Sequence, residues 1–185
     1  NADIIGVLEG EETVTVGGML LFGKDPQRRI PQSFITFAVF DGLLLTDELL
    51  DKQNIGGTLP ELILQTHAKT RTFLPKPSTL SGMQRVEVPM IPDKVIREAL
   101  VNAVCHRDYS ISNRRIAVYV FSDRLEISSP GRLPNTLNLE KILTGNSALR
   151  NQFLLKYLDK VKYIDGLGRG GSDDCQRNQG EFSLQ

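Results

Sequence analysis

The chain has 185 residues, of which 40% are hydrophobic and 24% charged, as is typical of a soluble protein with one large or two small domains. The 22 Lys and Arg residues balance the 22 Asp and Glu residues, so no overall charge attracts nucleic acid or a membrane. No apolar run could span a bilayer, and Cys105 and Cys175 lack the neighbours of a zinc site or disulfide framework. We therefore expect a cytoplasmic protein without a membrane partner, and the opening Asn-Ala-Asp indicates a fragment of a longer chain.

Residues 13–22 end in the apolar run Met-Leu-Leu-Phe and predict a strand with a glycine break. Residues 18–24 also fit Gly-x-x-x-x-Gly-Lys, the skeleton of a phosphate-binding P-loop. A P-loop needs an irregular loop followed by Ser or Thr, whereas the next residue is Asp25, whose charge would repel phosphate. We therefore favour the strand. After a turn over 25–31, residues 33–41 are apolar on both faces and predict a central strand.

A helix over residues 59–73 is predicted because Thr58 and Glu61 have capping-box spacing around Pro60. His67 lies on this helix with no partner at metal-ligand spacing, so a surface or half-buried histidine is the better interpretation.

Pro75-Lys-Pro-Ser78 marks a joint between an N-terminal strand and helix subdomain, residues 1–77, and a second domain, residues 78–185. Hydrophobic periodicity in the second domain predicts further elements. These are strands over 83–88, 115–121 and 124–128, a short helix over 138–143, and a helix after Ser147 that carries Phe153, Leu154, Tyr157, Leu158 and Val161.

Residues 91–109 form the strongest helical pattern, with Pro92 at its start and apolar residues at three- and four-residue steps. Glu98, Asn102 and His106 follow one another at four-residue spacing along another stripe of this helix. They suit a polar pocket wall, and a solvated helix face is the alternative. The His-Arg-Asp that begins at His106 also fits a kinase catalytic loop, but the lysine strand and Asp-Phe-Gly motif of kinases are absent from the sequence.

Three separated pieces could together bind a nucleotide: Glu98 with Asn102, then Ser129-Pro-Gly131, then the glycine-dense stretch 166–170. Glu98 could deprotonate a water for attack on the terminal phosphate. The amide oxygen of Asn102 is a hard neutral ligand that could complete the coordination of Mg²⁺. Glycines let backbone amides approach phosphate closely.

The segments 97–109, 123–134, Arg150-Asn151 and Gly-Leu-Gly at 166–168 together resemble a bacterial and archaeal family. Its members are labelled transcriptional regulators or RecG-related ATP-dependent DNA helicases, and they typically carry an upstream Schlafen/AlbA-like nucleic-acid-binding domain. The resemblance covers roughly residues 14–171, and the later half of the family is similar to the GHKL ATPases. The fold that this implies is an α/β (α+β) sandwich, with a GHKL-like mixed sheet covered by helices, preceded by a smaller α/β subdomain.

The resemblance also implies ATP and Mg²⁺ as cofactors. Glu98 would be the catalytic residue, and Asn102 would bind the metal and the nucleotide. The further nucleotide contacts would be His106, Ser129, Gly131, Gly166, Gly168 and Gly170. GHKL enzymes bind the adenine amino group with an Asp, where this chain has Ser129, whose hydroxyl accepts a hydrogen bond without the assistance of a charge.

Three hypotheses follow. The first is an ATP-binding module that could hydrolyse ATP slowly. It would belong to a DNA-binding transcriptional regulator that contacts DNA through other domains, and it could form a homodimer. The second is a degenerate scaffold for dimerisation or protein interaction, in which Glu98 and Asn102 only cap or brace neighbours. The third, direct nucleic-acid binding, rests on Arg114-Arg115, and the balanced charge opposes it.

Overall fold

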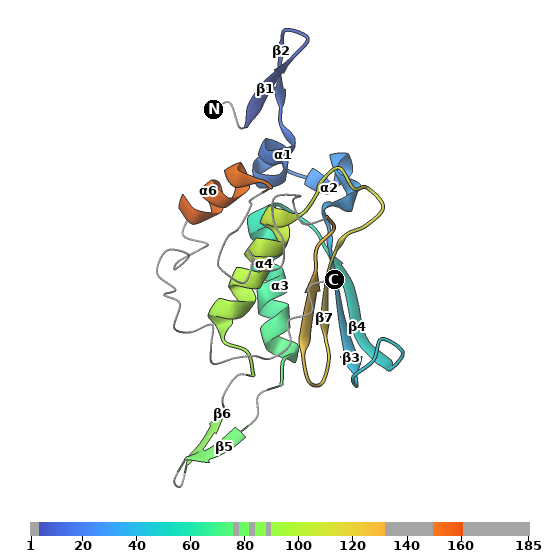
Figure 1. Cartoon of the computed structure of the whole chain (residues 1–185), viewed down its shortest axis with the longest axis vertical. Coiled ribbons are helices and arrows are strands. Elements are labelled where there is room, and N and C mark those ends of the chain that lie inside the picture. Colours follow the sequence, from blue (N-terminus) through green and yellow to red (C-terminus); the bar gives the residue numbers. More distant parts are fainter. Residues whose placement is uncertain (1–3, 76–77, 82–83, 88–89, 132–149, 161–185) are drawn as a thin grey trace, which may run out of the picture.

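A computed structural model describes residues 4–75, 78–81, 84–87, 90–131 and 150–160. Four strands form a mixed sheet in the order β4-β3-β7-β8, with β3 parallel to β7 and the other pairs antiparallel. The strands are β3 (Ile35–Asp41), β4 (Glu48–Ile55), β7 (Ile116–Val120) and β8 (Leu125–Ser128). Helices lie against one face of this sheet (Figure 1), so the predicted α+β fold class is confirmed.

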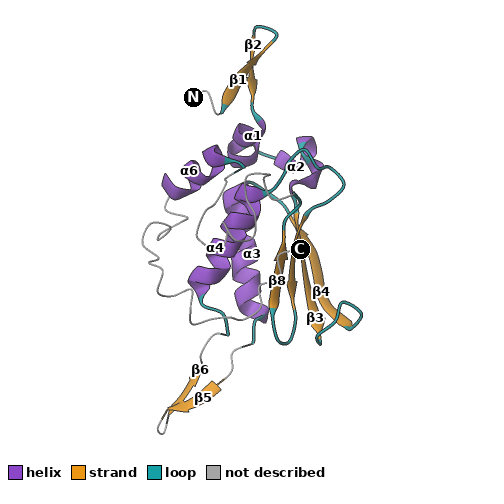
Figure 2. Ribbon diagram, in the orientation of Figure 1, coloured by secondary structure: helices purple, strands orange, loops and turns teal. Residues whose placement is uncertain are grey.

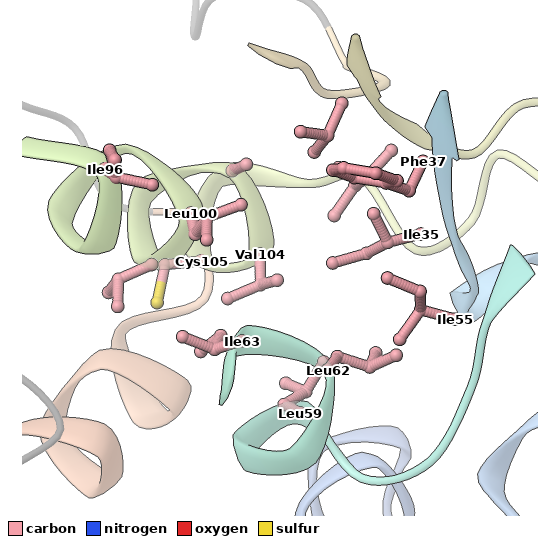
Figure 3. Packing of buried hydrophobic residues seen from close by; sticks show 14 of the residues in the cluster. Ile35, Phe37, Ile55, Leu59, Leu62, Ile63, Ile96, Leu100, Val104 and Cys105 are labelled. Carbon is pink, nitrogen blue, oxygen red and sulfur yellow. The ribbon is translucent and has the colours of Figure 1, made fainter. Parts of the chain in front are cut away.

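The hydrophobic core lies between the sheet and two long helices. These are α3 (Leu59–Phe73) and α4 (Asp93–His106). Ile35, Phe37 and Val39 of β3 are buried, as expected of a central strand under a helical layer. Figure 3 shows Ile35 and Phe37 pointing toward side chains of α3 and α4, among them Leu62 and Val104. The central strand predicted over residues 33–41 is therefore confirmed.

Helix α3 begins as its sequence predicts. The backbone N–H of Thr58 donates to the carboxylate of Glu61 at 2.7 Å, and the capping box is complete. His67 is more buried than expected, at 9% exposure, and its Nε2 lies 3.8 Å from the Asp93 carboxylate at the start of α4.

A hairpin and short helices precede the sheet (Figure 2). They are β1 (Ile5–Leu8), β2 (Glu11–Val14), α1 (Val16–Phe22), α2 (Pro26–Arg29) and a 3-10 turn at Pro31–Ser33. The turn predicted over residues 25–31 thus consists of short helical turns, each opened by a proline.

The strand predicted over residues 13–22 is wrong in its second half, which forms α1. Thr15 caps this helix by accepting a hydrogen bond from the backbone N–H of Gly18 at 3.0 Å, and Leu20 and Leu21 are buried. A short apolar run does not distinguish a buried strand from a buried helix, and here the cap favours the helix. The stretch is thus helical where a P-loop would need an irregular loop.

Strand β4 was not predicted, because its side chains are mostly exposed and do not alternate cleanly. It forms at the edge of the sheet, where its backbone pairs with β3 across a register irregularity at Val39/Phe40. The predicted strands over 115–121 and 124–128 are confirmed as β7 and β8. The strand over 83–88 is confirmed as β6 (Gln84–Glu87), which pairs with β5 (Ser78–Ser81).

Strands and core residues from both sides of the predicted joint at residues 75–78 belong to one sheet and one cluster. The division at residue 77 stays a prediction. The helix predicted around Phe153 is confirmed as α6 (Gln152–Lys160), whereas Ser147 and the helix over 138–143 lie outside the described residues. Within the described part of the chain, none of the helices has the length and hydropathy to cross a membrane.

Candidate functional site

The predicted site begins with the helix stripe, defined as Glu98, Asn102 and His106 of α4. Glu98 and Asn102 are exposed and His106 is half-buried, while Leu100 and Val104 on the opposite side of the helix face the core. Neither Glu98 nor Asn102 forms a hydrogen bond or ion pair with any residue that the structure describes. Among the described residues, neither side chain therefore has a polar partner that a ligand would have to displace.

Side chains from three other segments cap the C-terminal end of α4. The last carbonyls of a helix have no partner within it. The hydroxyl of Ser129 donates to the carbonyl oxygen of Ala103 at 2.7 Å, and that of Tyr109 donates to Val104 at 3.1 Å. The side-chain amide of Asn151 donates to the carbonyls of Cys105 and Arg107, both at 2.9 Å. These bonds bring residues 129–131 and 150–151 to the end of the helix stripe.

The Ser-Pro-Gly loop, residues 129–131, packs directly against this end. The carbonyl of Pro130 accepts a hydrogen bond from the backbone N–H of Asp108 at 2.8 Å. Gly131 has φ +145°, and a Cβ there would lie 3.4 Å from Cβ of Asp108 and 3.6 Å from the carbonyl oxygen of His106. These distances are ordinary van der Waals contacts, so the positive φ is what favours glycine here. The structure thus places the Ser-Pro-Gly loop at the C-terminal end of α4, beside His106, whereas Gly166, Gly168 and Gly170 lie outside the described residues.

Arg107 is fully buried and anchors the segment that follows α4. Its guanidinium donates to four backbone carbonyls: those of Asp108 at 2.7 Å, Arg114 at 2.7 Å, Ile111 at 3.1 Å and Gln32 at 3.2 Å. In the kinase pattern this Arg would precede a catalytic Asp. Here Asp108 instead accepts hydrogen bonds from the N–H and hydroxyl of Ser110, so the His-Arg-Asp motif serves to end the helix.

Asp108 and Arg150 form an ion pair near the C-terminal end of the stripe. Nη1 of Arg150 lies 2.6 Å from the Asp108 carboxylate. The pKa of Asp108 is lowered mainly by its hydrogen bonds from Ser110 and further by the positive charge of Arg150. The pKa of His106 is lowered by burial and by repulsion from Arg150, so its imidazole is neutral at neutral pH.

The metal-binding capacity of the site rests on a single protein oxygen. Across the described ranges, no three His, Cys, Asp or Glu side chains gather around a common point. Asn102 offers an exposed amide oxygen, which fits Mg²⁺ because this ion binds through few protein ligands and completes its shell with phosphate oxygens and waters.

Sequence reasoning missed the roles of Arg107, Tyr109 and Asn151. These residues lie in the segments that carry the family resemblance, which could have drawn attention to them. No sequence pattern around them shows which carbonyls they bind. The hydrogen bonds of Asn151 join residues 44 and 46 positions apart.

Residues 113–177 match the family described as "Putative ATP-dependent DNA helicase recG C-terminal". This match confirms the predicted resemblance to a RecG-related, ATPase-like domain. The matched segment includes the Ser-Pro-Gly loop. The helix stripe lies before it in the chain. No curated protein matches the chain. The crystal structure of the DIP2311 protein from Corynebacterium diphtheriae has a similar fold, with a TM-score of 0.69 and 24% identity over 86% of this chain. The chain covers 32% of that protein.

Proposed function

We propose that this chain is an ATP- and Mg²⁺-binding module that hydrolyses ATP slowly. One structural observation carries the proposal. Glu98 and Asn102 are exposed and have no hydrogen-bond or ion-pair partner among the described residues, and the Ser-Pro-Gly loop, with Gly131 at a positive φ, packs against the C-terminal end of the same helix. The family match of residues 113–177 supports nucleotide as the ligand.

Each residue of the stripe has a distinct task in this proposal. Asn102 would hold Mg²⁺, which neutralises phosphate charge when it is bound. Glu98 would orient a water and accept its proton, since a carboxylate free of ion pairs can serve as a general base. His106, kept neutral by burial, would contact the nucleotide as a hydrogen-bonding group rather than as a cation.

The test is to titrate the chain with ATP and with a non-hydrolysable analogue, each with and without Mg²⁺. Calorimetry measures binding, and phosphate release measures hydrolysis. Glu98→Gln should keep binding and lose hydrolysis, whereas Asn102→Ala should lose the Mg²⁺ dependence of binding. Lys52→Gln, at an exposed position on strand β4, is the control and should behave as wild type. Absence of binding at millimolar nucleotide would refute the proposal.

One observation favours a second candidate, a scaffold without nucleotide. The hydroxyl of Ser129, which stands where GHKL enzymes place their adenine-binding Asp, donates its proton to the Ala103 carbonyl at 2.7 Å and so stabilises the end of α4. Under the scaffold hypothesis the wild-type chain forms a stable dimer in light scattering and binds no nucleotide. Binding of ATP by a monomer excludes it.

We further propose that the module belongs to a DNA-binding transcriptional regulator whose DNA contacts lie in other domains. The balanced charge of this chain supports DNA binding by other domains, because a DNA-binding surface needs an excess of positive charge. Exposed Arg114 and Arg115 are the local exception, and the ring of Phe34 lies 5.7 Å from the guanidinium of Arg115. A salt-dependent DNA gel shift by this chain alone would contradict the proposal.

A further inference from the structure

Arg150 stands beside both described parts of the candidate site. Its Nη1 donates to Oδ2 of Asp108 at 2.6 Å, and the backbone of Asp108 is bonded to Pro130 of the Ser-Pro-Gly loop. Arg150 also lies close enough to His106 for its charge to disfavour protonation of that imidazole. His106 is one helical turn from Asn102, which places it roughly 5–6 Å along the helix face. The guanidinium is thus held where the loop meets the helix stripe.

The proposed nucleotide site needs a cation at this end, because Lys94, four residues before Glu98, lies at the opposite end of the stripe. Glu98 contributes a carboxylate, Asn102 and Ser129 are neutral, and His106 is neutral because of its burial. A nucleoside triphosphate keeps a net negative charge even with one Mg²⁺ bound. Arginine is well suited to it, because the planar guanidinium can donate two parallel hydrogen bonds to phosphate oxygens.

The ion pair between Arg150 and Asp108 does not prevent this role. The Arg150 and Asp108 side chains are 32% and 24% exposed, so water screens their ion pair and the pair is weak. Asp108 also has other partners, the N–H and hydroxyl of Ser110, which remain if Arg150 leaves. A phosphate group can therefore replace Asp108 without leaving a buried charge unpaired.

We propose that Arg150 is a phosphate-binding residue of this site, and that its guanidinium exchanges Asp108 for the phosphates of the nucleotide. The inference rests on the nucleotide binding proposed above. In the free protein, Asp108 keeps the guanidinium beside the Ser-Pro-Gly loop. In the bound protein, the same guanidinium contacts the ligand.

The experiment compares ATP, ADP and adenosine on the full 185-residue chain, by calorimetry for the nucleotides and ligand-observed NMR for adenosine. Arg150→Gln should weaken ATP binding roughly 10- to 100-fold, as expected for lost charge-assisted hydrogen bonds, and should leave adenosine binding unchanged. Asp108→Asn removes the same ion pair but keeps Arg150, so ATP should bind as tightly as to wild type or more tightly. Lys156→Gln, exposed on α6, is the charge-matched control and should bind as wild type.

The outcomes separate this inference from the proposed function. If wild type binds ATP and Arg150→Gln binds it equally well, the role of Arg150 is overturned while nucleotide binding stands. If Asp108→Asn weakens ATP binding as much as Arg150→Gln does, the ion pair only braces the fold, and the inference is again overturned. If wild type binds neither ATP nor adenosine, both proposals fail.

Discussion

Replacement of Arg107 is expected to destabilise the protein more than any exposed substitution on α4. The guanidinium is buried at 0% exposure and donates to four carbonyls from two separate parts of the chain. In Arg107→Met the aliphatic volume remains, but these partly buried carbonyls lose their donors. The cost comes from unsatisfied polar groups rather than from a cavity.

The magnitude follows from the two shortest bonds, to the carbonyls of Asp108 and Arg114, both at 2.7 Å. At about 1.5–3 kcal/mol for each charge-assisted bond, their loss lowers the free energy of unfolding by about 3–6 kcal/mol. Domains of this kind have a total of about 5–15 kcal/mol. For a chain of this size, the melting temperature should fall by roughly 6–24 °C.

The assay is urea unfolding followed by circular dichroism, with Lys94→Met as the control. Lys94 is exposed on the same helix and makes no bond to the described residues, so its replacement should change the free energy of unfolding by less than about 0.5 kcal/mol. Arg107→Lys should lie between wild type and Arg107→Met, because an ammonium cannot reach all four carbonyls. A loss below about 1 kcal/mol in Arg107→Met would refute the reasoning.

Three further predictions concern stability and reactivity. Asn151→Ala removes two bonds to the carbonyls at the end of α4 and should cost about 1–3 kcal/mol in urea unfolding, whereas Gln152→Ala, exposed at the next position, should cost little. Burial lowers the pKa of both His67 and His106, so the unfolded chain binds more protons than the folded one below about pH 6.5, and stability should fall as pH drops through that value. Unfolding midpoints at pH 8 and pH 5 measure this, and a midpoint that rises on acidification would contradict it. Burial also raises the pKa of Cys105 to about 12, so in a variant whose other cysteine is Ser, a thiol reagent at pH 8 should react only after denaturant is added.

The sequence itself predicted those elements whose signals are local. The apolar spacing of α4, the capping box of α3 and the two-faced apolar pattern of β3 each occur within one turn or a few strand residues. Such patterns predict the elements correctly because the apolar side chains that form them are the ones buried in the core. The alignment of Glu98 with Asn102 is of this kind too, since helix geometry alone places residues four apart on one side.

Only the tertiary structure decided the remaining features. The apolar residues of the Met-Leu-Leu-Phe run suit a buried strand or a buried helix, and in the fold they form the helix α1 with Leu20 and Leu21 in the core. Strand β4 depends on backbone pairing with β3, which leaves little trace in its mostly exposed side chains.

The end of α4 is the clearest case. Ser129 and Asn151 lie 26 and 46 residues from the carbonyls of Ala103 and Cys105 that they satisfy, so no local pattern could reveal their roles. A helix end buried in the fold needs partners for its last carbonyls, and any segment that passes nearby can supply them. The sequence determined which residues could carry chemistry. Long-range hydrogen bonding determined which of them meet.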